Sequence, residues 1–355
     1  MRQINVLVTG IGGPTAQGVM QGLREKDNVY IVGVDRRRVT PGHAFCHKAY
    51  QIPPYTERED YKEAIADIVE KEKIDAIFPS LHEEIDIYAE FRHALHAEVA
   101  LPRSNMLTHL KDKESVYHYL EKCHLHTYIP KYAGFNDPEE LKNIITKKYE
   151  SDRYVVVKQV DGHGSLGFAI LTDRKNYLEA LKKGKKNVHN IHDYYEICPN
   201  DRKIVMEYLE GPEYSVDVLV HGGKVVTAIP RERTGVSNGL VLDGKVIRHD
   251  ELIAAATNIA ESFVTSGFLN LQFISGKDGY KLTDINPRFC GSQIMSLGAG
   301  VNFPYLFLQY LLLGEYVTVT PKWNTRMLRF RDQFFVEEEE ENMLSTPVFK
   351  QQMRT

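Results

Sequence analysis

Short apolar runs alternate with amphipathic stretches through the N-terminal part of the chain. Residues Ile4–Thr9 form an apolar run that ends at a glycine, which is typical of a buried strand. The pattern then predicts a helix over about Thr15–Arg24 and a second strand over Tyr30–Val34. A strand–helix–strand order of this kind predicts a parallel sheet and an α/β fold class.

A loop at the end of a later strand is a candidate ligand contact. The pattern predicts a strand over Ala76–Pro79, and the loop Ser80–Glu84 follows it. Ligands of open α/β sheets bind at the carboxyl ends of the strands, so His82 or Glu83 could contact a substrate. Acidic residues also favour the start of a helix, which is predicted over Ile85–Leu95. We prefer the interpretation that the loop caps this helix.

From about residue 105 onward, strands joined by short turns replace the regular alternation. Apolar and β-branched runs predict the strands Tyr154–Lys158, Phe168–Leu171, Ile204–Leu209, Tyr214–Val220 and Val225–Ile229. Helices are predicted over about Glu114–Cys123 and Glu251–Thr265. The apolar run Tyr305–Leu313 is too short to cross a membrane, so it predicts a core helix.

One predicted hairpin, over about residues 270–288, carries several polar side chains. An Asp-Gly pair between its two strands is a strong turn signal. Asp284 and Asn286 share one face of their strand, and a pairing that places Gln272 opposite them makes an oxygen-only cluster. Such ligation suits Mg²⁺, which is usually held by a few protein oxygens plus the phosphates of a nucleotide. Arg288 follows on the same face and could meet an anion, whereas the structural alternative is a polar edge hairpin.

A glycine-rich stretch follows the strand that ends at Lys158. Residues Gly162–Gly167 include three glycines, which let the backbone approach an anion and present N–H groups to it. Lys158 can reach the same phosphates as a point charge. The stretch lacks the Gly-Lys-Ser/Thr ending of a Walker-type loop. We therefore prefer phosphate binding around Gly164 and Ser165 over a plain hairpin connection.

Other polar positions are open to both a functional and a structural interpretation. Arg231 and Arg233 share one strand face and could bind a carboxylate or phosphate, or form surface salt bridges. Lys113 lies at a helix start, where a positive charge is unfavourable, yet spacing alone favours a solvated charge pair. Glu213 could bridge ribose hydroxyls, although by itself it marks an ordinary hairpin.

The N-terminal glycines invite a dinucleotide-binding interpretation. Gly10–Gly13 follow the first strand, and Asp35 ends the second, where a ribose hydroxyl would bind. The cluster Arg36–Arg38 could favour a 2′-phosphate. The glycine pattern is incomplete, because Thr15 stands where a third glycine is expected. We prefer a βαβ fold whose tight turn requires glycines.

Composition narrows the classes of function. The 355 residues suffice for two or three domains, and the net charge of −4 gives no general basic surface for nucleic acid. The four cysteines are scattered without Cys-x-x-Cys spacing, so we expect neither a zinc site nor a disulfide framework. This cysteine usage and an N-terminus without a signal peptide favour a cytoplasmic location with no membrane partner. The acidic run Glu337–Glu341 predicts a solvated tail.

Taken together, these stretches resemble the ATP-grasp superfamily, and specifically its carbamoyl phosphate synthetase-like branch. The resemblance covers about residues 1–325 in order. It rests most strongly on an N-x-Q-F strand at 270–273 and a D-x-N-P-R strand at 284–288. Family members usually carry Glu where this chain has Asp284, which still supplies a carboxylate on a shorter arm.

The resemblance implies a role for each candidate residue. The implied metal ligands, for Mg²⁺ or for Mn²⁺ in its place, are Gln272, Asp284 and Asn286. Arg288 is the implied catalytic residue that holds the acyl phosphate, and we expect Arg231 or Arg233 to assist it. The implied ATP-binding residues are Lys113, Lys158, Gly164, Ser165, Glu207, Tyr208, Leu209 and Glu213.

The implied fold is a Rossmann-like pre-ATP-grasp domain followed by a two-lobed ATP-grasp domain. The predicted segments are 1–105 for the first domain, 106–205 for a lid subdomain, 206–330 for a large subdomain with the metal site, and 331–355 for a tail. The implied activity is an ATP- and Mg²⁺-dependent carboxylate–amine ligase that forms an acyl phosphate. Its partners would be a small-molecule carboxylate, an amine and a second copy in a homodimer.

Three rival functions stay open. One is a carbamoyl phosphate synthetase-like half-reaction on bicarbonate or carbamate, because the chain is too short for both synthetase halves. Another is an NAD(P)-dependent enzyme that uses Gly10–Gly13 and Asp35. The third is a nucleotide-binding regulatory module without turnover, which would not need Arg288. The residues expected to line the substrate are Ser80–Glu84, Arg231–Arg233 and Ser292–Gly300.

Overall fold

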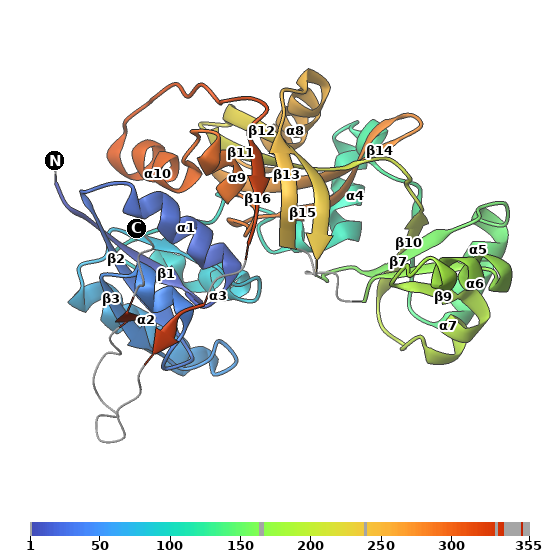
Figure 1. Cartoon of the computed structure of the whole chain (residues 1–355), viewed down its shortest axis with the longest axis horizontal. Helices are drawn as coiled ribbons and strands as arrows, with labels where there is room; N and C mark the ends of the chain where they lie inside the picture. The colour runs from blue at the N-terminus through green and yellow to red at the C-terminus, as the bar shows by residue number, and fades with distance from the viewer. Residues whose placement is uncertain (1, 163–166, 238–239, 331–332, 337–348, 351–355) are drawn as a thin grey trace. The chain divides into compact units, whose positions relative to one another are not determined.

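The computed structural model describes residues 2–162, 167–237, 240–330, 333–336 and 349–350 (Figure 1). The chain forms two compact units. The first unit comprises Met1–Thr108, Ser215–Asn270 and Asn286–Thr355, and the second comprises His109–Tyr214 and Leu271–Ile285. The predicted phosphate-binding residues Gly164 and Ser165 and the acidic run from residue 337 to 341 lie outside the described residues.

A five-stranded parallel sheet forms the N-terminal part of the first unit, in the order β3-β2-β1-β4-β5. Its strands are β1 (Ile4–Thr9), β2 (Val29–Asp35), β3 (Lys48–Gln51), β4 (Ala76–Phe78) and β5 (Glu98–Val99). The central strands are apolar on both faces, as expected of a parallel sheet that is covered on both sides. The prediction of a parallel α/β sheet is confirmed.

Helices cover both faces of this sheet (Figure 1). They are α1 (Pro14–Arg24), α2 (Arg58–Lys71), α3 (Glu84–Phe91) and α10 (Phe303–Phe307). Val6 and Val8 share a core with α1 and α10, whereas Leu7 shares a core with α2 and α3. The alternation of side chains along β1 therefore divides the apolar residues between the two layers. The predicted core helix over Tyr305–Leu313 corresponds to α10 and a π-helical turn, Leu308–Leu313.

A second sheet has the strand order β15-β14-β11-β12-β13-β16. Its strands are β11 (Glu213–His221), β12 (Lys224–Ser237), β13 (Leu240–Val246), β14 (Gly267–Gly276), β15 (Gly279–Asn286) and β16 (Arg326–Leu328). The helices α8 (Asp250–Phe263) and α9 (Ile294–Gly298) lie between these strands in the sequence. β14 and β15 form the hairpin that the Asp-Gly turn predicts, and residues 271–285 of this hairpin belong to the second unit.

The second unit is built on a five-stranded sheet in the order β6-β10-β7-β8-β9. These strands are β6 (Tyr132–Phe135), β7 (Val155–Gln159), β8 (Ala169–Thr172), β9 (Val188–Asn190) and β10 (Lys203–Glu207). Its helices are α4 (Lys113–Lys122), α5 (Pro138–Lys148), α6 (Arg174–Lys182) and α7 (Ile191–Ile197). Leu141 of α5 and Tyr194 of α7 share a core with Val157 and Val205 of the sheet. This core fixes the position of β7, which carries Lys158.

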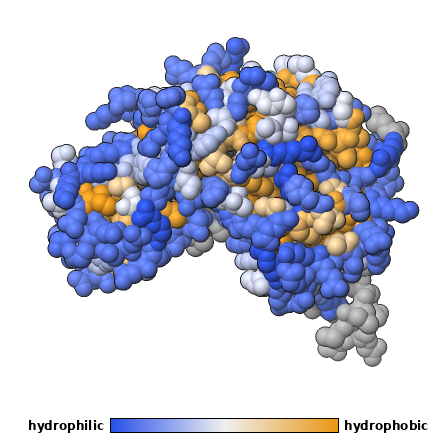
Figure 2. Space-filling model, turned by 180° about the vertical axis from the view of Figure 1, so that it is seen from behind, coloured by the Kyte–Doolittle hydropathy of each residue, from blue (hydrophilic) through white to orange (hydrophobic). Residues whose placement is uncertain are grey.

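Hydrophilic residues cover most of the face shown in Figure 2, with apolar residues gathered in patches between them. This distribution agrees with a chain in which 26% of the residues are charged. Within the described ranges, no helix has both the length and the apolar character needed to span a bilayer.

Candidate active site

Four of the predicted nucleotide and metal residues come together in the second unit. Lys113 begins α4, Lys158 lies on β7, Glu213 begins β11 and Asp284 lies on β15. The charges of the other three all act on the ammonium group of Lys158. Residues from four separate elements therefore form one charged cluster.

Lys113 is buried, with only 7% of its side chain exposed. Its Nζ lies 3.4 Å from Oδ1 of Asp284 and donates a hydrogen bond of 2.9 Å to the main-chain oxygen of Gly162. Its backbone N–H donates to the main-chain oxygen of Val160. The interpretation of Lys113 as a solvated charge pair is therefore wrong. The side chain instead links β15 to the segment that leaves β7, because packing buries the first turn of α4 there.

Lys158 carries a destabilised charge. Burial and the nearby ammonium group of Lys113 lower the pKa of Lys158 to about 8, while Asp284 and Glu213 act in the opposite direction. Its Nζ also lies 6.0 Å from the ring centroid of Phe168. An anion placed beside the two lysines would restore the balance of charge, and phosphate oxygens are suitable for this.

The predicted adenine hinge, from residue 207 to 209, leads out of β10. The carboxylate of Glu207 accepts a hydrogen bond of 2.7 Å from the backbone N–H of Lys131. The ring of Tyr208 lies 5.3 Å from that of Tyr154. These contacts fix the side chains of the first two residues of the hinge.

A glycine fastens this hinge to the β14–β15 hairpin. A Cβ atom on Gly211 would lie 2.0 Å from the main-chain oxygen of Ser275, so only glycine allows this approach. The backbone N–H of Ser275 donates to the main-chain oxygen of Pro212 at 3.1 Å. The hinge and the strand residues Gln272 and Asp284 are thus parts of one local structure in the second unit.

The three predicted metal ligands lie on the two strands of the hairpin. The main-chain oxygen of Gln272 accepts a hydrogen bond of 3.3 Å from the hydroxyl of Thr283, so the strands are adjacent at this level. The side chain of Asp284 is 23% exposed, whereas Asn286 is 7% exposed. One carboxylate and two amide oxygens are hard ligands of the type that Mg²⁺ prefers. In the described part of the chain, no three His, Cys, Asp or Glu side chains gather around a point, so a metal here would depend on the amides.

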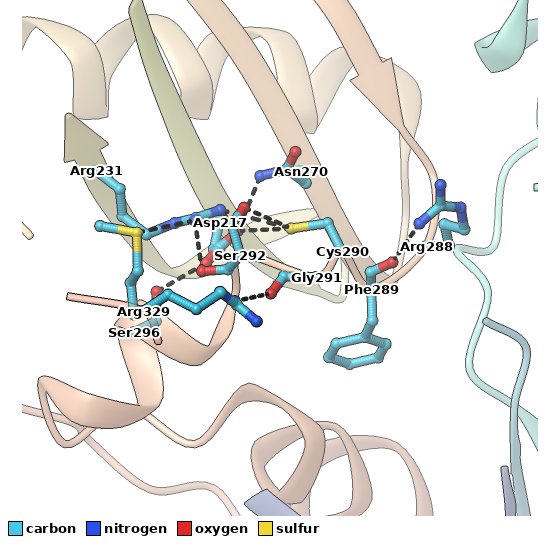
Figure 3. Close-up of polar contacts among 11 residues, drawn as sticks. Asp217, Arg231, Asn270, Arg288, Phe289, Cys290, Gly291, Ser292, Ser296 and Arg329 are labelled. Carbon is cyan, nitrogen blue, oxygen red and sulfur yellow. Dashed lines mark hydrogen bonds and ion pairs between the residues drawn. The ribbon is translucent and has the colours of Figure 1, made fainter. Parts of the chain in front are cut away.

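Arg231 is at the centre of a buried polar network in the first unit (Figure 3). Its side chain and that of Asp217 are both 0% exposed, and Nη2 of the arginine lies 2.6 Å from Oδ1 of the aspartate. Its Nη1 donates a hydrogen bond of 2.6 Å to the main-chain oxygen of Ser292. Both terminal nitrogens of Arg231 are therefore engaged by protein groups.

The other two predicted arginines also lie in the first unit. Nη1 of Arg288 donates to the main-chain oxygen of Phe289 at 2.8 Å and lies 3.5 Å from the hydroxyl of Thr15. Arg233 is half-buried on β12. Direct substrate contact by Arg288 and Arg233 stays a prediction.

Asp217 is the central residue that the sequence analysis does not single out. It lies in the middle of β11, where the strand is otherwise largely apolar. Its carboxylate accepts hydrogen bonds from Nδ2 of Asn270 at 2.9 Å and from the hydroxyl of Ser296 at 2.7 Å. The sequence could have indicated this network, because a lone carboxylate inside an apolar strand is expected to be buried and a buried charge requires partners.

Two family models match parts of the chain. Residues 6–101 match a PylC-like N-terminal domain, and residues 200–331 match an ATP-grasp in the biosynthetic pathway with Ter operon. The chain has the ATP-grasp fold. The predicted fold class and the resemblance to this superfamily are confirmed.

Solved ATP-grasp structures match nearly the whole chain at low identity. The biotin carboxylase domain dimer of 2-oxoglutarate carboxylase from Hydrogenobacter thermophilus, in complex with MgADP, ADP and bicarbonate, is 15% identical and has a TM-score of 0.68 over 100% of this chain and 84% of that one. An ADP complex of the N5-carboxyaminoimidazole ribonucleotide synthetase PurK is 17% identical, with a TM-score of 0.66 over 90% and 81%. An L-amino acid ligase from Bacillus licheniformis is 14% identical, with a TM-score of 0.59 over 90% and 78%.

In the domain that precedes the ATP-grasp region, a buried carboxylate organises the loop after β4. Glu84 accepts the backbone N–H groups of Ser80 and Leu81, each at 3.1 Å, and the hydroxyl of Tyr61 at 2.7 Å. Burial raises the pKa of Glu84. The residue at the N-cap of α3, Glu83, makes no side-chain cap. The predicted capping of this helix by Glu83 is therefore wrong, and Glu84 instead orders the loop that precedes the helix.

Asp35 of the same domain is engaged by its own chain. Its carboxylate accepts the backbone N–H of Gly12 at 3.0 Å. It also accepts the backbone N–H of Arg37 at 3.0 Å and the guanidinium of Arg37 at 2.9 and 3.1 Å. A Cβ atom on Gly12 would lie 2.0 Å from that guanidinium, which thus fills the space beside the glycine turn. These contacts argue against a dinucleotide at this position.

Proposed function

We propose that this protein is an ATP- and Mg²⁺-dependent ligase that joins a small-molecule carboxylate to an amine through an acyl phosphate. The observation that carries the proposal is the charged cluster of Lys113, Lys158 and Asp284 in the second unit. Two buried ammonium groups beside a carboxylate suit a polyphosphate and its divalent cation. The matched carboxylase domain and synthetase contain MgADP or ADP, which supports the same class of ligand here.

The proposed nucleotide contacts are all made by residues of the second unit. Lys113 and Lys158 neutralise the phosphates, and binding restores the full charge that burial disfavours on Lys158. The backbone of residues 207–209 meets the adenine edge, and Glu213 accepts the ribose hydroxyls. Because these groups are held in place before ATP arrives, they act by position and electrostatics and need no covalent step on the protein.

In the proposed reaction, a carboxylate oxygen of the substrate attacks the γ-phosphorus and ADP leaves. Magnesium, held by Gln272, Asp284 and Asn286, would supply neutralisation of charge on the phosphates. Arg288 follows these ligands in the sequence and binds the acyl phosphate. The amine then attacks the acyl carbon, Arg288 stabilises the tetrahedral oxyanion, and phosphate leaves.

A second candidate uses bicarbonate in place of an organic carboxylate. The matched carboxylase domain was solved with bicarbonate present, and this observation favours including that anion. Attack of a bicarbonate oxygen on the γ-phosphorus would produce carboxyphosphate by the same chemistry. The contacts described for the nucleotide would be the same in both cases. Bicarbonate is therefore tested beside the organic acids.

The deciding experiment measures ADP release from Mg²⁺-ATP with a panel of amino acids, other small carboxylates and bicarbonate, each with and without an added amine. We expect release that depends on one acid, and hydroxylamine should trap its acyl phosphate as a hydroxamate. Trapping with an organic acid supports the carboxylate–amine ligase. If ATP binds tightly and no panel member causes ADP release, the proposal is replaced by a nucleotide-binding module without turnover.

A further inference from the structure

The Asp217–Arg231 pair is built into the first unit away from every exposed surface. Each oxygen of the carboxylate has a hydrogen-bond donor, because Asn270 and Arg231 bind Oδ1 and Ser296 binds Oδ2. Burying a charged pair has a desolvation cost that a well-packed apolar pair would avoid. Stability alone is therefore a weak reason for placing these residues here.

The pair contacts one segment of chain at several points. This segment, from residue 290 to 296, follows β15 after three intervening residues and includes the first residues of α9. Arg231 donates to the main-chain oxygen of Ser292 at 2.6 Å, and its Nη2 lies 3.6 Å from Sγ of Cys290. Asp217 holds the far end of the segment through the Ser296 hydroxyl. The segment is thus tied at both ends to one buried ion pair (Figure 3).

Arg288 lies between this segment and the end of β15. Its neighbour Phe289 is fully buried, and the ring of Phe289 stacks on that of Phe268 at 4.3 Å with an interplanar angle of 7°. Nη1 of Arg288 donates to the main-chain oxygen of Phe289. The guanidinium therefore depends on a backbone that the aromatic stack and the 290–296 segment hold in place.

We propose that the Asp217–Arg231 pair is a positioning device that clamps residues 290–296 and thereby holds Arg288 where it meets the acyl phosphate. This inference rests on the proposed function for the role of Arg288. It assigns to Arg231 an action through the segment and not through contact with substrate. The fork of the guanidinium is essential, since one ammonium group cannot hold Asp217 and the Ser292 carbonyl in the same geometry.

The test begins with the variant Arg231→Lys, which keeps the charge and removes the fork. Hydrogen exchange of the amides in residues 290–296 should become about tenfold faster or more, because the clamp is opened locally. The turnover number for ADP release should fall roughly 10- to 100-fold, since small displacements of a catalytic group have effects of this size. Nucleotide affinity should be unchanged, because Lys113, Lys158 and Glu213, the proposed phosphate and ribose contacts, lie in the second unit.

A double-mutant cycle with Arg288 distinguishes a positioning role of Arg231 from a general loss of structure. In an Arg288→Lys background, the further change Arg231→Lys should have little additional effect on turnover, because both changes disable the same group. Additive losses in the double variant would overturn the positioning role. The milder change Ser296→Ala keeps the test available if Arg231→Lys does not fold, with smaller shifts in the same direction.

The matched control is Arg326→Lys, which alters the exposed Arg326–Asp243 pair of the same unit. Exchange in residues 290–296 and turnover should both stay at wild-type values in this variant. Unchanged exchange in Arg231→Lys would refute the clamp whatever the enzyme does. If wild-type protein releases no ADP with any acid, the proposed function fails, while the exchange measurement still decides whether the pair holds the segment.

Discussion

The Nζ of Lys113 lies 3.4 Å from Oδ1 of Asp284, so an ion pair joins the start of α4 to β15 within the second unit. The resemblance to ATP-grasp proteins implies that Lys113 binds the phosphates of ATP and that Asp284 binds the metal. Each of these two charges therefore partly neutralises the other. Binding of a magnesium ion by Asp284 and of a phosphate by Lys113 would replace this ion pair with two new ones, one for each residue. We expect nucleotide and metal to bind cooperatively for this reason.

Replacing the carboxylate of Asp284 should separate folding from catalysis. Asp284→Asn removes the charged metal ligand and keeps the size of the side chain. We expect Mg²⁺-dependent ADP release to fall roughly 100-fold or more, since a metal site supplies several kcal/mol of charge stabilisation. The melting temperature should fall only modestly, because Asn keeps the size of the side chain and Lys113 keeps its hydrogen bond to the main-chain oxygen of Gly162. Steady-state kinetics and thermal melting check both parts.

The control for that variant lies in the same hairpin. Asp278→Asn makes the same chemical change at an exposed turn position, and Asn-Gly suits such a turn as well as Asp-Gly does. Activity and melting temperature should match the wild type. Equal losses of activity in the two variants would indicate damage to the hairpin and remove Asp284 from the metal site.

ATP affinity should depend on pH through Lys158. The pKa of this lysine is lowered to about 8 in the free protein, and only its protonated form attracts phosphate. Binding therefore raises the pKa, so that affinity is fully present below pH 8 and is lost as the pH rises. We expect the ATP dissociation constant to increase about tenfold for each pH unit above 8 until the pKa of the complex is reached. Isothermal titration at several pH values measures this.

The variant Lys158→Arg tests the origin of that pH dependence. A guanidinium stays charged across the whole range, so the dissociation constant for ATP should become nearly independent of pH between 7 and about 10. Affinity at pH 7 should change only modestly if the longer side chain reaches the phosphates. A variant that keeps the wild-type pH profile would show that another group is responsible.

Breaking the buried ion pair should be far more costly than breaking an exposed one. Asp217→Ala leaves Arg231 charged and without its carboxylate in a fully buried position. We expect the free energy of unfolding to fall by about 3–5 kcal/mol. In the exposed Arg326–Asp243 pair, Asp243→Ala should have little effect, because solvent screens that pair. Urea denaturation followed by circular dichroism compares the two, and similar losses would contradict the prediction.

The glycine turn after β1 should not bind a dinucleotide. The carboxylate of Asp35, which would have to bind a ribose, already accepts hydrogen bonds from Gly12 and Arg37. We expect NADPH fluorescence to be unchanged by the protein at concentrations where ATP binds. Arg37→Ala frees part of the Asp35 carboxylate and is the sensitive variant. NADPH binding to the wild type would revive the dehydrogenase interpretation.

Local patterns in the sequence predicted most of the order of helices and strands. β1 coincides with the predicted strand Ile4–Thr9, and the hairpin turns at the predicted Asp-Gly pair. Apolar periodicity and turn residues act over a few positions, so they can be recognised without knowing the fold. The N-x-Q-F and D-x-N-P-R stretches could be recognised for the same reason, because each spans only four or five consecutive residues.

Only the tertiary structure decided which charges are buried and what they face. Lys113 looked like a solvated residue by spacing, and packing of α4 against β15 buries it beside Asp284. The sequence analysis did not single out Asp217, which is one polar residue in an apolar strand, yet three other elements bring Arg231, Asn270 and Ser296 to its carboxylate. The energy of a charge depends on burial and on partners distant in the chain. Neither burial nor the identity of distant partners is a property of a local stretch of sequence. Both can be known only once the fold is known.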